Sequence, residues 1–165
     1  MLFRSEGRVG PGPFSLSVHN AVAALDSIAH QDTGYYSAVA AGRETAEAAL
    51  VEACALLADG ADRVLVTVYD ETLPDIYRGD ADDTDAAYAW SWLVTAAPAG
   101  AGIELAWEPR GHETARGSAA LPAAGPTVPS QTLPHALDVL RFALSDDCEL
   151  THDGPHQRWT WRRSA

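Results

Sequence analysis

The residues best placed to do chemistry lie in the segment FSLSVHNA, residues 14–21. A short apolar run ends there and a helix-forming stretch begins, so His19 and Asn20 are expected at the first turn of a helix. A helix N-terminus carries a partial positive charge that stabilises a thiolate or an oxyanion, and many enzymes hold a nucleophile at such a turn. Neither side chain is a typical acyl-accepting nucleophile. In the simpler interpretation, Asn20 caps the helix and His19 packs or forms a hydrogen bond.

The other candidate residues carry weaker signals. Cys54 lies on an apolar helical stripe, which is typical of a small core residue, and Cys148 follows two aspartates that disfavour its thiolate. His152 and His156 lie four residues apart across a turn, and the sequence offers no third or fourth ligand near them. The acidic stretch 70–85 lacks the glycine and glutamate positions of a calcium loop and is expected to be a solvated surface loop. We therefore predict neither a metal nor a cofactor.

Charge and composition exclude several classes of protein. The 165 residues carry eleven basic side chains, all arginine, and 23 acidic ones, for a net charge of −12. Such a surface repels a phosphate backbone, and only Arg158, Arg162 and Arg163 resemble a basic cluster, so nucleic acid is not an expected partner. With 47% apolar residues, no run long enough to span a membrane and no secretory signal, the sequence predicts a cytoplasmic globular protein.

The first half of the chain predicts alternating strands and helices. Strands are expected at 14–18, 35–41 and 63–69, and helices at 19–31 and 44–59. The last strand, RVLVTVY, is almost continuously apolar, which is typical of a parallel strand covered on both faces. Together these elements predict the α/β class with a βαβαβ core and right-handed crossovers.

The second half predicts added antiparallel hairpins. The alternating segment 87–97 is expected to pair with 103–107, and 108–130, rich in proline and glycine, to form a flexible loop. A last helix and a closing hairpin, with Trp159 and Trp161 on one face, are expected at 133–145 and at 148–151 with 157–163.

Three segments together carry a resemblance to a known family. The segment SLSVHNA with the helix to His30, then SAVAAGRETAEAALVEACALLADG, then RVLVTVYDETLP, resemble the β-ketoacyl synthase-like N-terminal domain of chain-length-factor proteins from aryl polyene clusters. The resemblance covers about residues 14–77 and is weaker in the last helix and terminal hairpin. It implies a thiolase-like half-fold and one domain over residues 1–165.

The resemblance also implies a role without catalysis. Condensing enzymes of this kind place a catalytic cysteine at the start of a helix, and the alignment puts Asn20 there, with His19 as the neighbouring option. Their two catalytic histidines belong to a second half-domain, so the histidines of this chain inherit no role. The implied protein is a chain-length factor that forms a heterodimer with an active ketosynthase in aryl polyene, polyketide or fatty-acid-type elongation. Ser17, Ala21 and Ala24 would line the acyl tunnel or the interface, and acyl carrier protein would dock through the partner.

The front of the chain departs from the family pattern. A βαβα portion is expected before the first strand, and MLFRS resembles translated adaptor sequence. We therefore expect an N-terminally truncated chain in which residues 1–13 are non-native or disordered.

Two other functions remain open. In the first, His19 and Asn20 themselves process an acyl thioester, and turnover of a malonyl or acyl carrier protein by the chain alone would reveal it. In the second, the chain is a stand-alone binding domain, which would be a stable monomer without affinity for carrier protein.

Overall fold

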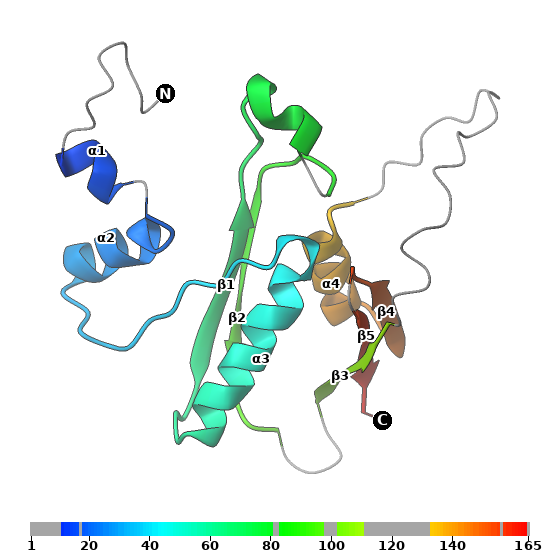
Figure 1. The fold of residues 1–165 in the computed structure, drawn as a ribbon. Coiled ribbons are helices and arrows are strands. Elements are labelled where there is room, and N and C mark those ends of the chain that lie inside the picture. Colours follow the sequence, from blue (N-terminus) through cyan, green and yellow to red (C-terminus); the bar gives the residue numbers. More distant parts are fainter. Residues whose placement is uncertain are drawn as a thin grey trace, which may run out of the picture. The chain divides into compact units, whose positions relative to one another are not determined.

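The computed structural model describes residues 11–16, 18–80, 83–97, 102–110, 133–155 and 157–164. The chain divides into two compact units, residues 1–40 and 41–165, and each is described by itself. The first contains helices α1 (Pro11–Ser15) and α2 (Ala21–His30) (Figure 1). The elements of the second are η1 (Gly42–Glu44), α3 (Thr45–Ala58), β1 (Val64–Asp70), η2 (Asp75–Asp80), β2 (Tyr88–Val94), β3 (Ile103–Pro109), α4 (His135–Leu144), β4 (Glu149–Asp153) and β5 (Gln157–Arg163).

Helix α2 is the element of residues 1–40 that the sequence predicts correctly. It begins directly after Asn20, and Gln31 closes it in the left-handed conformation with φ 53°. The strand expected at 14–18 is wrong, since Pro11–Ser15 forms the short helix α1. Proline is favoured in the first turn of a helix, where its missing N–H is not needed. Residues 1–10 of the segment expected to be non-native lie outside the described residues.

The predicted βαβαβ core is also wrong in its details. Residues 35–41 have no regular secondary structure, so of the three strands expected in the first half only β1 is formed. A single strand leaves its backbone N–H and C=O groups unpaired. The backbone groups of β1 find their hydrogen-bond partners in β2, which pairs with it antiparallel, rather than in a parallel sheet. The mixed α/β class is confirmed, but the described sheets are antiparallel.

Strands β1 and β2 form a two-stranded sheet with one buried face. Val68 lies opposite Trp90 and Val66 opposite Trp92, and these side chains face the core. The alternation predicted for β2 is confirmed. The opposite face, with Leu65 at 67% exposure, is open, so the expectation that β1 is covered on both faces is wrong.

The second sheet has the strand order β3-β5-β4. The hairpin expected between 87–97 and 103–107 is not formed, because β2 pairs with β1 and β3 pairs with β5. The closing hairpin is confirmed, and the N–H of Gly154 donates to the carbonyl of Gln157 at 2.9 Å in its turn. Most of the loop expected at 108–130 lies outside the described residues, although β3 continues to Pro109.

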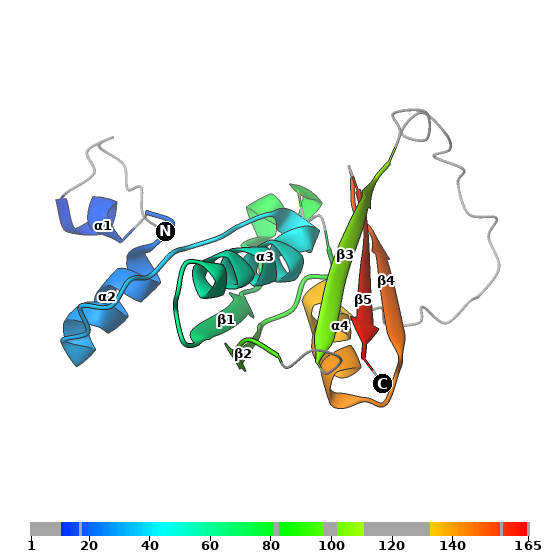
Figure 2. The same ribbon diagram turned by 90° about the horizontal axis from the view of Figure 1, so that it is seen from below.

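One hydrophobic core connects both sheets and two helices. Helix α3 lies along the buried face of the β1–β2 sheet, and α4 lies against the three-stranded sheet (Figure 2). Trp161 of β5 is fully buried and contacts Phe142 of α4, with ring centroids 6.5 Å apart. The buried members of the core are Ala46, Leu50, Ala53, Val66, Val68, Trp90, Ala136, Val139, Phe142 and Trp161. None of the helices in the described ranges has the length and apolar character of a membrane span.

The C-terminal end of α4 is held by an arginine of β5. The Nη2 of Arg163 donates to the carbonyls of Phe142, Ala143 and Ser145 at 2.9, 3.2 and 3.0 Å. The last carbonyls of a helix have no partner within the helix, and a cation there also interacts favourably with the helix dipole. The other two arginines of the C-terminal basic cluster pair with Asp153 and Glu149.

We expect Phe142→Ala to lower the free energy of unfolding by about 3–5 kcal/mol, because it removes a buried ring from the contact between α4 and β5. Leu144→Ala, on the same helix at 79% exposure, is the matched control and should change stability little. Urea denaturation followed by far-UV circular dichroism measures both. Equal effects of the two substitutions would contradict this description of the core.

Candidate functional site

Three titratable side chains meet inside the second unit. Glu47 lies on the buried face of α3 beside Ala46 and Leu50, His135 is the first residue of α4, and His152 faces inward from β4. Their exposed fractions are 0%, 5% and 6%. Each occupies a position where the period of its element would place an apolar residue. The cluster is therefore built into the core.

The carboxylate of Glu47 is the centre of this cluster. Its Oε1 lies 2.5 Å from Nε2 of His135 and accepts a hydrogen bond from the indole Nε1 of Trp161 at 3.1 Å. The Nδ1 of His152 lies 3.5 Å from the same oxygen, which is too long for a hydrogen bond. The two imidazole rings stack with centroids 3.4 Å apart. The backbone N–H of His135 donates to Asp83 at 2.7 Å, which fixes the start of α4.

The surroundings of Glu47 favour its ionised form. Burial raises the pKa of Glu47, but hydrogen bonding by His135 and the proximity of His152, with the charge of His135 and the indole N–H of Trp161, outweigh that effect and lower the pKa to about 2. The carboxylate is consequently charged at neutral pH although it is fully buried. A carboxylate and two imidazoles are also the donor types that bind divalent transition metals.

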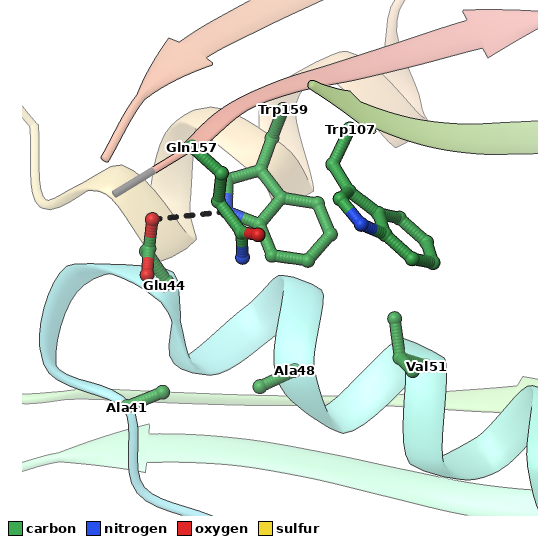
Figure 3. Close-up of a pocket in the computed structure, with 7 residues that line it drawn as sticks. All are labelled: Ala41, Glu44, Ala48, Val51, Trp107, Gln157 and Trp159. Atoms are coloured by element: carbon green, nitrogen blue, oxygen red, sulfur yellow. Dashed lines mark hydrogen bonds between the residues drawn. The ribbon is translucent and has the colours of Figure 1, made fainter. Parts of the chain in front are cut away.

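A shallow groove of about 340 Å³ lies between α3 and the tryptophans of β3 and β5 (Figure 3). Trp107 and Trp159 form one wall, facing Ala48 and Val51 of α3, and Glu44 closes one end. The complete lining is Ala41, Glu44, Ala48, Val51, Trp107, Gln157 and Trp159. The walls suit an apolar or aromatic group, and the Glu47 cluster is not part of them.

Glu44, the last residue of η1, and Glu47 of α3 each accept a hydrogen bond from a tryptophan of β5. Glu44 accepts from Trp159 at 3.1 Å, as Glu47 accepts from Trp161. Gly154, in the closing turn, approaches Glu44 so closely that a Cβ at this position would overlap Oε1 of Glu44. A side chain at this position would therefore require the Glu44 carboxylate to move, at the cost of its hydrogen bond with Trp159.

The candidates at the predicted turn lie in the other unit, residues 1–40. His19 and Asn20 are exposed at the start of α2, and the Asn20 side chain forms no capping hydrogen bond. Ala21 is buried and Ala24 is half-buried, whereas Ser17 lies outside the described residues. The role of these five residues stays a prediction.

The cluster of Glu47, His135 and His152 is not predicted from the sequence, although the position of His135 in its helix is a signal for burial. His135 stands at helical spacing from Val139 and Phe142, on the buried face of α4. His152 was considered together with His156, a residue outside the described part, rather than with Glu47. Cys54 was expected in the core but is exposed.

We expect Glu47→Gln to flatten the pH dependence of stability. The folded-state pKa of about 2 lies below the ordinary value of 4.5, so the stability that ionised Glu47 contributes is complete above about pH 5 and is lost as the pH falls toward 2. Its size is on the order of 3 kcal/mol. Urea denaturation from pH 7 to 2.5 in the presence of EDTA measures the slope. Glu52→Gln on the same helix is the control, and an unchanged slope in Glu47→Gln would contradict the assignment.

Comparisons with known proteins agree with the resemblance seen in the sequence. Residues 3–162 match the family model described as β-ketoacyl synthase, N-terminal domain. No curated protein matches the chain. The fold is similar to a chain in the solved structure titled ketosynthase (ApeO) in complex with its chain length factor (ApeC) from Xenorhabdus doucetiae, with a TM-score of 0.72 and 22% sequence identity. The match covers 96% of this chain and 59% of that chain, so this chain spans less than two thirds of its structural neighbour.

The structural likeness confirms the predicted thiolase-like ketosynthase fold, although the strands of residues 1–40 differ from the expected ones. The family match covers nearly all of the sequence. The chain therefore belongs to the β-ketoacyl synthase family, as a member of its N-terminal domain class.

Proposed function

We propose that the chain is a non-catalytic ketosynthase-like subunit, a chain-length factor, that pairs with an active ketosynthase and shapes the tunnel for the growing acyl chain. The observation that carries the proposal is the placement of its cysteines. Cys54 lies in the second half of α3 and Cys148 directly before β4, so neither stands at a helix N-terminus where a thiolate would be stabilised. A condensing reaction would then depend on the cysteine of a partner.

The start of α2 supports the same proposal. The position that the family resemblance assigns to the nucleophile holds Asn20, whose carboxamide does not form an acyl enzyme. Ala21 and Ala24 follow it on the first turn of α2, where small side chains leave room for an acyl chain or a partner side chain. The histidines of the buried cluster do not supply an alternative site, because they face Glu47 and do not line the groove.

Two further observations favour a heterodimer. The similar solved structure is, by its title, a ketosynthase with its chain length factor. In this chain, Val22, Leu25 and Ile28 of α2 are 58%, 53% and 74% exposed, and large exposed apolar side chains on one element are typical of an interaction surface. The net charge of −12 disfavours direct docking of an acidic carrier protein, so docking through the partner is expected. Aryl polyene synthesis is the elongation system that the resemblance suggests.

Coexpression with a ketosynthase of the same source tests the proposal. We expect the tagged chain to retain the ketosynthase through gel filtration and to change the length of the acyl product. Ala24→Phe should keep the complex but shorten the main product, because the larger side chain would fill the tunnel. Ala55→Phe, at an exposed position of α3, is the matched control and should leave product length unchanged. If the unmodified chain neither copurifies with the ketosynthase nor changes product length, the proposal is wrong.

The alternative of an acyl-thioester-processing enzyme has one observation in its favour, the exposure of His19 beside the start of α2. Turnover of malonyl or acyl carrier protein by the chain alone, abolished in His19→Ala, would establish it in place of the subunit role. A stable monomer that binds neither ketosynthase nor carrier protein would instead indicate a stand-alone binding domain.

A further inference from the structure

The Glu47 cluster has a feature that the proposed subunit role does not use. Three potential metal ligands, one from each of Glu47, His135 and His152, lie within 4.8 Å of one another, and all three residues are buried. They come from α3, α4 and β4, elements that are distant in the sequence. Buried groups of this kind are normally fully hydrogen-bonded.

In this cluster the hydrogen bonding is incomplete. Both ring nitrogens of His152 and the Oε2 of Glu47 are buried without a hydrogen-bond partner. One nitrogen of a neutral imidazole carries a proton and the other a lone pair, so burial of His152 without partners leaves a donor and an acceptor unsatisfied. The side chain of His152 is 5% exposed and its Nδ1 faces the carboxylate at 3.5 Å. The lone pairs of His152 and of the Glu47 carboxylate that have no hydrogen-bond partner are suited to bind a metal ion.

We propose that Glu47, His135 and His152 bind one divalent transition-metal ion, with Zn²⁺ as the best fit. Two imidazoles and one carboxylate are a known zinc ligand set, completed by a water or another oxygen in the fourth position. Ligand distances of about 2.0–2.2 Å in a tetrahedron place the ligand atoms about 3.3–3.6 Å from one another. The His152–Glu47 separation of 3.5 Å already fits, and the His135–Glu47 contact of 2.5 Å must widen.

Metal binding by His135 requires that a proton leave its Nε2 atom. Nε2 of His135 has to present a lone pair to the metal, so a proton on this nitrogen moves to Nδ1 or to solvent. Trp161 donates to Oε1 of Glu47 and so holds the carboxylate in place beside the two imidazoles. Asp83 accepts from the backbone N–H of His135 and lies 3.8 Å from Arg43, so both of its oxygens already have partners. The ion would bridge α3, α4 and β4.

Metal binding by the whole chain tests this proposal without any ketosynthase partner. After treatment with EDTA and gel filtration, we expect titration with ZnCl₂ to show one site by calorimetry, with MgCl₂ giving no heat. A ligand that binds only the folded state raises the melting temperature, here by about 5 °C or more at 100-fold excess over Kd. Bound Co²⁺ should show the visible absorption of a four-coordinate ion.

The matched variants are His152→Gln and His30→Gln. Loss of a direct ligand should weaken zinc binding by more than the ~10–100-fold that follows loss of an outer-shell partner. His30 is an exposed histidine 3.2 Å from Asp26, so it controls for adventitious binding by a surface histidine–aspartate pair. Circular dichroism shows whether each variant is folded. A single site that is retained in His30→Gln and lost in His152→Gln supports the proposal.

Three results would overturn it. They are the absence of stoichiometric zinc binding by the unmodified chain, binding that persists in folded His152→Gln, and binding that His30→Gln removes. Because these measurements need no partner and no acyl substrate, failure here leaves the chain-length-factor proposal unaffected, and the converse also holds.

Discussion

A charged carboxylate can be buried only where donors surround it, and in residues 41–165 that requirement joins the main elements. Glu47 comes from α3, its hydrogen-bonding partners His135 and Trp161 come from α4 and β5, and His152 from β4 lies beside them. Without α4 or β5 the charge would lose one of its two hydrogen-bonding partners inside an apolar core, and an incompletely paired buried charge is far more costly than an exposed one. The cluster thus makes one arrangement of helices and sheets more favourable than its alternatives.

The sequence predicts correctly those elements that depend on residues close together in the chain. The helix periods around α2, α3 and α4 and the closing turn at Gly154 were found from sequence, because each depends on neighbours a few residues away. Strand pairing depends on distant residues. The segments of β2 and β3 both read as hairpin strands, yet their partners are β1 and β5, and no short-range signal distinguishes these pairings. The same reason explains the missing strands at 14–18 and 35–41.

The candidate site shows the same contrast between local features, which the sequence predicts, and contacts between distant residues, which it does not. The start of α2 after Asn20 could be located from its helix signals, whereas the strand expected before it is not formed, and the role assigned to His19 and Asn20 rests on family resemblance. Glu47, His135 and His152 are separated by most of the unit, and each alone looks like an ordinary polar residue on an amphipathic element. The signal for these three residues is a charged or imidazole side chain on the apolar face of its helix or strand. A polar side chain in such a position is buried and therefore requires a hydrogen-bonding or charged partner.

The distribution of tryptophan between the two units has a practical consequence. All five indoles belong to residues 41–165, and Trp159 and Trp161 stand within hydrogen-bonding distance of the carboxylates described above. Residues 1–40 contain only phenylalanine and tyrosine as aromatic residues. Intrinsic fluorescence excited at the red edge of the absorption band therefore reports on the larger unit alone. A melting curve recorded in this way is blind to the helix that carries Asn20.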